Sequence, residues 1–274
     1  YHAKNVFFRL EKSEKDEVRR TAENSKGWYD DELTKQKVDW KEGFDVGAQD
    51  GSLDKRGLDG VNQWPDEQKY ESIKGFQATL REYYEACTKF ARTLTCAMTA
   101  GMGLPAESLV TKHFDDCHSS YLRMNFYPTC PEPDKHMSIS EHTDAGAVTV
   151  LTQSMVQSLQ VYQPRDGCWY EVVPMKNSFV INTGDVMQVW SNGHYKAPLH
   201  RVKAQLSLER FSSPFFYNPS YETNYEPVES MITQERPKQY NPINWGKFRL
   251  GRFQGDFADV GEEIQIEHFR IKYD

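Results

Sequence analysis

A run of short β-rich segments after Pro105 most constrains how this chain can fold. The segments are rich in β-branched and aromatic side chains, and Gly, Pro or Asn residues separate them. They read YLRMNFYP, AVTVLTQ, SLQVYQ, WYEVVP, SFVINTGD, MQVWSNG, HRVKAQ and RFSSPFFYNP. Several short strands at this spacing predict a β-sandwich or a barrel.

A helical pattern precedes these segments. Pro65, Asp66 and Glu67 have the character of a helix start, with acidic residues on the first turn. Apolar residues then recur at i+3/i+4 spacing, which predicts a long amphipathic helix over 66–100 whose apolar stripe packs on the core. These residues are Ile73, Phe76, Leu80, Tyr84, Cys87, Ala91, Leu94 and Met98. We expect shorter helices at 13–20 and within INWGKFRLGRF.

The chain length and these patterns predict one main domain with covering segments. A chain of 274 residues can bury one substantial core. We expect an N-terminal helical covering region over 1–104, the β-rich core over 105–228 and a C-terminal covering segment over 229–274.

Charge and composition favour a small-molecule partner. The formal net charge is −7 and no segment carries a Lys/Arg stripe, which disfavours nucleic acid and anionic membranes. The five cysteines include no CxxC pair, as is typical of reduced thiols, so we expect a cytoplasmic protein. We also expect a monomer. No apolar run approaches the roughly 18 residues that span a bilayer. The start YHAKNVFFRLEKSEK is unlike a signal peptide. Because it does not begin with Met, we expect further sequence before it.

The stretch SISEHTDAGAVTVLT places His142 and Asp144 two positions apart. Residues i and i+2 of a strand lie on one face, about 6 to 7 Å apart, so both side chains would be presented together as metal ligands. His200 lies in APLHRV after the turn signal SNGHYK, and antiparallel pairing would bring it beside His142. Two imidazoles and one carboxylate are typical of non-haem Fe(II) oxygenases. Zinc with the same ligands is the competing interpretation.

A second pair of residues follows the last histidine. Arg210 and Ser212 would share one face of a strand. A planar guanidinium beside a hydroxyl suits a carboxylate held bidentately, although a surface ion pair is the alternative for Arg210 alone.

Together these segments resemble the plant-type 2-oxoglutarate/Fe(II)-dependent dioxygenases, the family that includes isopenicillin N synthase and anthocyanidin synthase. The ordered motifs HxD, NGxYKxxxHRV and RxS carry the resemblance, which covers nearly the whole chain. YLRMNFYPTCP, GWYDDELTKQKVDWKEGFDVG and INWGKFRLGRFQGDF add to it. The resemblance implies a mainly β fold with flanking helices, built on a double-stranded β-helix (jelly-roll) core. Ser158 and Phe126 depart from the family's usual Gly and Tyr, and the start looks shortened.

The resemblance also implies roles for individual residues. The implied Fe(II) ligands are His142, Asp144 and His200. The implied 2-oxoglutarate pocket consists of Arg210, Ser212, Tyr127 and Asn125, with the first three holding the distal carboxylate. Arg123 and Phe216 correspond to positions near the substrate. Aromatic residues of the covering segments would shape the mouth of the barrel as lids. These are Trp28, Tyr29, Tyr240, Trp245, Phe248 and Phe253.

The implied activity is oxidation of an unactivated C–H bond by O2, with 2-oxoglutarate converted to succinate and CO2. The reaction would be a hydroxylation, a desaturation or an oxidative ring closure of a small molecule of secondary metabolism. Because a buried guanidinium is costly without an anion or acceptor, Arg123 predicts a carboxylate or another polar acceptor on that substrate. The alternative partner of Arg123 is a protein acid such as Glu141, or 2-oxoglutarate itself.

Three other functions compete with this interpretation. An oxidase like isopenicillin N synthase would use the same triad without 2-oxoglutarate. A non-catalytic ligand-binding relative and a zinc hydrolase are the others, and the chain lacks the HExxH spacing of many zinc hydrolases.

Overall fold

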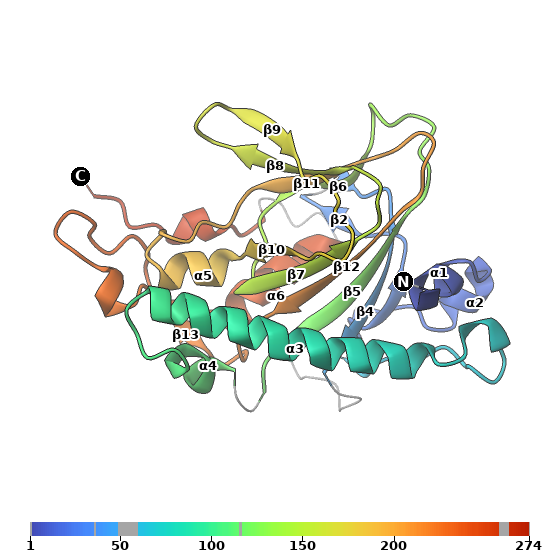
Figure 1. Cartoon of the computed structure of the whole chain (residues 1–274), viewed down its shortest axis with the longest axis horizontal. Helices are drawn as coiled ribbons and strands as arrows, with labels where there is room; N and C mark the ends of the chain where they lie inside the picture. Colours follow the sequence, from blue (N-terminus) through green and yellow to red (C-terminus); the bar gives the residue numbers. More distant parts are fainter. Residues whose placement is uncertain (1, 36, 49–59, 115–116, 258–262, 274) are drawn as a thin grey trace.

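Two antiparallel sheets face each other and enclose the centre of the molecule (Figure 1). The structure, a computed structural model, describes residues 2–35, 37–48, 60–114, 117–257 and 263–273. The larger sheet contains, in spatial order, β1 (Gly27–Tyr29), β4 (Glu42–Gly47), β5 (Tyr121–Tyr127), β12 (Arg210–Tyr217), β7 (Val148–Gln153) and β10 (Val180–Thr183). The smaller contains β6 (Met137–His142), β11 (His200–Lys203), β8 (Leu159–Gln163) and β9 (Cys168–Glu171). This arrangement confirms the jelly-roll core.

Two short two-stranded ladders accompany the main sheets. One pairs β2 (Leu33–Thr34) with β3 (Lys37–Val38), and the other pairs β13 (Asn224–Tyr225) with β14 (Ile243–Asn244). Because β1 and β4 belong to the larger sheet, the N-terminal region predicted only to cover the barrel also supplies strands.

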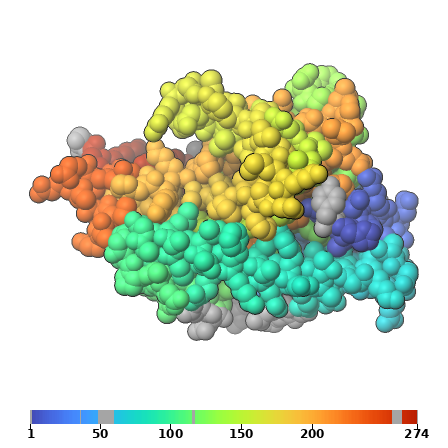
Figure 2. Space-filling model, viewed as in Figure 1, coloured from blue at the N-terminus to red at the C-terminus, as the bar shows by residue number. Residues whose placement is uncertain are grey.

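Helices pack outside the sheets and at their ends. The α-helices are α1 (His2–Phe8), α2 (Lys12–Asp16), α3 (Phe76–Gly101), α4 (Ser108–His113), α5 (Asp185–Trp190) and α6 (Trp245–Phe257). Short 3-10 turns are η1 (Glu71–Ile73), η2 (Glu229–Met231) and η3 (Ile266–Phe269). Helix α3 contacts β7 and β12, and Figure 2 shows it crossing the front of the molecule. No helix in these ranges is long and apolar enough to cross a bilayer.

The long helix begins at Phe76, so the predicted start near residue 66 is wrong. Gly75 has a φ of 79°, a left-handed conformation that separates the helix from the preceding turns. Asp66 Oδ1 instead accepts the backbone N–H groups of Gln68 and Lys69 at 2.9 and 3.2 Å. The carboxylate of Glu67 accepts the N–H groups of Gly75 and Gln77 at 2.8 and 2.7 Å. Glu67 therefore caps the helix from outside, while Asp66 holds the turn before it.

The predicted apolar stripe of this helix is confirmed as core packing. Phe76, Leu80, Tyr84, Cys87 and Ala91 are buried in the main hydrophobic cluster, and Leu94 and Met98 pack against it. All five cysteines are free thiols.

Residues 187–190 of the segment MQVWSNG are helical in α5, so its prediction as a strand is wrong. Every residue of α5 is buried, and a short apolar run that is buried on all sides has no periodicity to distinguish a helix from a strand. Helix α2 is shorter than the predicted 13–20, and α1 was not predicted. The C-terminal helix α6 confirms the helix expected in INWGKFRLGRF.

Candidate active site

A cavity of about 350 Å³ lies inside the barrel. Every residue predicted for the site lines it: Arg123, Asn125, Tyr127, His142, Asp144, His200, Arg210, Ser212 and Phe216. Strands of both sheets bring these side chains together.

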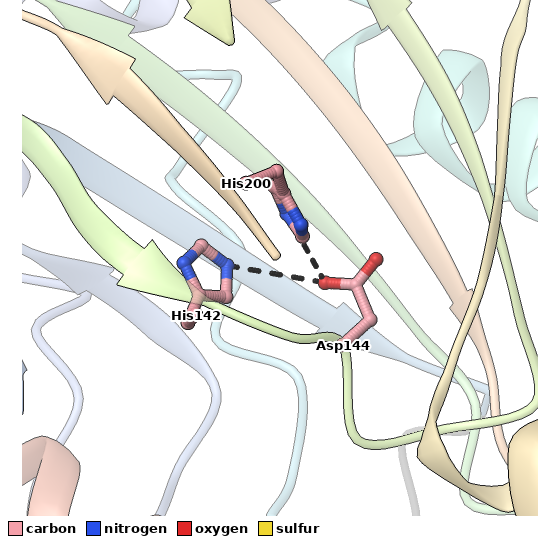
Figure 3. A group of neighbouring side chains, drawn as sticks. All are labelled: His142, Asp144 and His200. Atoms are coloured by element: carbon pink, nitrogen blue, oxygen red, sulfur yellow. Dashed lines mark ion pairs between the residues drawn. The ribbon is translucent and has the colours of Figure 1, made fainter. Parts of the chain in front are cut away.

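Three side chains converge at one part of the cavity wall (Figure 3). His200 on β11 pairs directly with His142 at the end of β6, as the sequence predicts. Asp144 Oδ1 lies 3.9 Å from His142 Nε2 and 3.6 Å from His200 Nε2. One ligand atom from each residue lies within 4.8 Å of the others. Three such atoms on one side of a common point suit a bound cation, so the predicted convergence is confirmed.

The expectation that His142 and Asp144 lie on one face of the same strand is wrong. Strand β6 ends at His142, and Asp144 lies in the following turn before β7. The turn, rather than the alternation of a strand, aims the carboxylate toward the imidazoles.

Neighbouring groups fix the orientation of each ligand. The carbonyls of Ser140 and Pro198 lie 2.8 and 3.0 Å from Nδ1 of His142 and His200. A carbonyl only accepts, so each Nδ1 carries the hydrogen and each Nε2 presents a lone pair. Asp144 Oδ2 accepts hydrogen bonds from Thr149 Oγ1 at 2.7 Å and from Asn182 Nδ2 at 2.6 Å. Oδ1 is therefore the oxygen left to face the cavity.

The electrostatics favour the protonation states that a metal requires. Burial, with the adjacent His200, lowers the pKa of His142 to about 3, so this imidazole stays neutral. Burial alone would raise the pKa of Asp144, but the neighbouring His200 and the hydrogen bonds from Thr149 and Asn182 outweigh burial, and the pKa lies below its usual value. Neutral imidazoles and an ionised carboxylate are the forms that bind metal ions.

A second polar group of the cavity suits an anion. Arg210 and Ser212 on β12 pair in register with Tyr127 and Asn125 on β5. The Tyr127 hydroxyl lies 3.0 Å from Ser212 Oγ, and Arg210 is only 1% exposed. Arg210 Nη2 donates to Gln153 Oε1 at 2.8 Å, while its Nε and Nη1 have no hydrogen-bond partner among the residues that the structure describes. Because buried, unsatisfied donors are costly, this guanidinium fits a carboxylate ligand.

Arg123 is satisfied by protein acids. Its Nε and Nη2 both donate to the Asp45 carboxylate at 2.8 Å, and its Nη1 lies 3.0 Å from Glu32 Oε2. Glu141, the acid suggested as an alternative, is exposed. The argument that Arg123 requires an anion on the substrate is therefore wrong, although its side chain still lines the cavity.

The aromatic residues predicted as lids mostly belong to the core. Only Trp245 among them lines the cavity in the described part of the chain. The others are buried: Trp28, Tyr29, Tyr240, Phe248 and Phe253. Phe216 lines the cavity and stacks on Tyr121 with ring centroids 4.7 Å apart.

Sequence reasoning missed the residues that support the site. Gln153 holds Arg210, while Thr149 and Asn182 hold Asp144. They lie on β7 and β10, and the register Ser212↔Gln153 places the glutamine beside Arg210 and Ser212. No spacing motif marks these residues, because their roles depend on how three strands align.

A jelly roll that carries a two-histidine, one-carboxylate triad and a buried arginine defines the class of non-haem iron oxygenases. Residues 118–219 match the sequence model of the 2OG-Fe(II) oxygenase superfamily. Residues 1–67 match that of the non-haem dioxygenase in morphine synthesis N-terminal region. The chain belongs to the 2OG-Fe(II) oxygenase superfamily.

Relatives of known sequence agree with this assignment. Protein DMR6-LIKE OXYGENASE 2 of Arabidopsis thaliana is 32% identical over 214 residues, which are 77% of this chain and 58% of the relative. Oxoglutarate-dependent flavonoid 7-O-demethylase 1 of Ocimum basilicum is 31% identical over 250 residues, covering 90% of this chain and 63% of the relative. The chain thus spans little more than half the length of the first of these and less than two thirds of the second.

Solved structures share the fold. A full-length Neurospora crassa protein, solved in complex with alpha-KG and thymine, superposes with a TM-score of 0.79 at 27% identity, covering 92% of this chain and 82% of that one. JOX2 in complex with 2OG, Fe and JA gives a TM-score of 0.78 at 26% identity, covering 90% and 71%. The C-terminal truncated form of the Neurospora crassa protein is 30% identical, with a TM-score of 0.64 and coverage of 80% and 76%.

Proposed function

We propose that this chain is an Fe(II)- and 2-oxoglutarate-dependent oxygenase that oxidises an unactivated C–H bond of a small organic molecule. The observation that carries the proposal is one cavity lined both by a metal-ligand triad and by a buried arginine with unsatisfied donors. The complexes of the Neurospora crassa protein with alpha-KG and of JOX2 with 2OG and Fe support the same pair of ligands here.

The triad residues would hold Fe(II) from one side and leave the remaining coordination positions for other ligands. When bound, the iron would supply O2 activation coupled to oxidation of 2-oxoglutarate to succinate and CO2. Thr149 and Asn182 keep Asp144 aimed at the metal position by holding its second oxygen.

The co-substrate would be oriented by the other polar group. Arg210 would meet the distal carboxylate of 2-oxoglutarate with its unpartnered N–H groups, and the hydroxyls of Ser212 and Tyr127 would complete that contact. Apolar walls from both sheets exclude water around it; they include Ile139, Leu151, Leu159 and Val202.

The substrate we propose is a small natural-product-type molecule with an apolar body and a polar group. The stacked rings of Tyr121 and Phe216 offer it a flat apolar surface. Glu32, Lys41 and Arg123 also line the cavity, but Glu32 pairs with both cations, so the three suit a neutral hydrogen-bonding group as well as an acidic one. We expect the protein to act as a monomer.

The test is succinate formation from 2-oxoglutarate with Fe(II) and O2 across a panel of small acids, phenolics and neutral heterocycles. We expect substrate-stimulated succinate release by the wild type and none by Asp144→Ala. Substrate-dependent O2 consumption without 2-oxoglutarate would instead support an oxidase like isopenicillin N synthase. A protein that binds candidates tightly but consumes neither O2 nor 2-oxoglutarate would contradict the enzymatic proposal.

A further inference from the structure

The turn between two of the triad residues is held by a side chain from the C-terminal helix. Arg252 on α6 donates from Nη2 to the carbonyl oxygen of Thr143 at 3.1 Å. Thr143 lies between His142 and Asp144, and Arg252 is 8% exposed and lines the cavity.

Groups at the start of α5 hold the rest of this turn. The N–H groups of Asp185 and Val186 donate to the carbonyls of Asp144 and Gly146 at 2.8 and 3.0 Å. The Thr143 hydroxyl donates to Asp185 Oδ2 at 3.3 Å. The contact from Arg252 therefore adds a side-chain tie between the triad turn and the C-terminal part of the chain.

Arg252 is itself fixed by two further residues near the end of the chain. Its Nε lies 2.9 Å from Glu263 Oε1, and its Nη1 donates to Gln265 Oε1 at 2.8 Å. All three nitrogens of the guanidinium thus have partners, so the fork has one defined position. A charged donor held in this way orients a carbonyl more strongly than a neutral donor would.

We propose that Arg252 is a positioning residue for the metal centre, so that retention of the metal depends on α6 and on residues 263–265. This inference rests on the proposed function, because the triad must bind a metal for its position to matter. Trp245 and Arg249, on the same helix, also line the cavity.

The experiment measures Co(II) affinity of the metal-free protein by titration, with circular dichroism to establish that each variant is folded. We expect Arg252→Met, and Arg252→Met with Glu263→Gln, to weaken Co(II) binding by about 10- to 100-fold, as loss of a group that orients a ligand does. Arg252→Met alone leaves the Glu263 carboxylate buried without Arg252, and the double variant removes that carboxylate. Arg252→Lys, which keeps the charge but not the fork, should recover part of the affinity.

Lys247→Met is the matched control, because it removes an exposed cation of the same helix that does not line the cavity. It should bind Co(II) as the wild type does. A folded double variant with wild-type Co(II) affinity would overturn the positioning role of Arg252 but leave the proposed function standing. A lower melting temperature without any change in affinity would show a purely structural role and would overturn it too. A wild-type protein that binds no Co(II) would overturn the proposed function itself.

Discussion

Arg210 places a full positive charge inside the barrel, where Gln153 is its hydrogen-bond partner. If its other N–H groups hold 2-oxoglutarate, Arg210→Lys should raise the apparent KM for 2-oxoglutarate at least about tenfold, since one lost charged hydrogen bond is worth about 1.5 to 3 kcal/mol. The KM for the primary substrate should change less. Arg92→Lys, on the exposed side of α3, is the control. Wild-type dependence on 2-oxoglutarate in the Arg210 variant would reject this role.

Arg123 illustrates a different use of a buried arginine. Its partners Asp45 and Glu32 are 7% and 3% exposed at their side chains, so Arg123→Met would leave both carboxylates short of a partner. We expect a loss of about 3 kcal/mol or more in the free energy of unfolding, measured by urea denaturation. Adding Asp45→Asn should recover part of that loss, because one uncompensated charge disappears. Unchanged stability combined with a selective loss of acidic substrates would restore the substrate-anchor hypothesis.

At this scale the sequence predicts the cavity residues but not their partners. His142, Asp144, His200, Arg210 and Ser212 belong to ordered motifs that are visible in the chain. The pairing of Arg123 depends on the register Asp45↔Arg123 between β4 and β5, which no local pattern reveals. The charge of a side chain can be read from the sequence, but the residues that neutralise this charge are known only once the sheet register is known.

Among the elements, helix α3 shows how a cap can be mistaken for a first turn. Glu67 accepts two backbone N–H groups at the helix start although it lies outside the helix. Glu67→Ala should lower the free energy of unfolding by about 1 kcal/mol, the usual cost of a lost N-terminal cap. Glu71→Ala is the comparison, because Glu71 is 78% exposed at its side chain and pairs with Lys74. Equal stability of the two variants would show that Glu67 is not a cap.

Strands were predicted more reliably than helix boundaries. The strands β5, β7, β8, β11 and β12 alternate between the cavity and the outer packing, and turn residues bound them. Helix α5 lacks that signal because it is buried on every side. Its start at Asp185 follows Gly184, where an added Cβ would lie 2.1 Å from the carbonyl oxygen of Gly146. This close approach to the triad turn explains why residue 184 is a glycine, and it can be recognised only once the neighbouring turn is known.

For the whole molecule, the order of motifs predicts the barrel and its cavity. How the covering segments contact the barrel is seen only in the structure. The N-terminal region adds β1 and β4 to the larger sheet, and α6 reaches the triad turn through Arg252. Both contacts join residues far apart in the chain, so no periodicity or spacing could reveal them. The division into 1–104, 105–228 and 229–274 remains a prediction.

Binding of 2-oxoglutarate under anaerobic conditions, measured by calorimetry with and without Fe(II), shows whether the triad and Arg210 serve one ligand. We expect tight binding that requires Fe(II), because the triad and Arg210 would hold opposite ends of one molecule in a single cavity. Asp144→Ala should bind 2-oxoglutarate no more tightly with Fe(II) than without it. Arg210→Met should lose most of its affinity for 2-oxoglutarate even with Fe(II) present. Equal 2-oxoglutarate binding with and without metal, or no binding by the wild type in either condition, would contradict the proposed function.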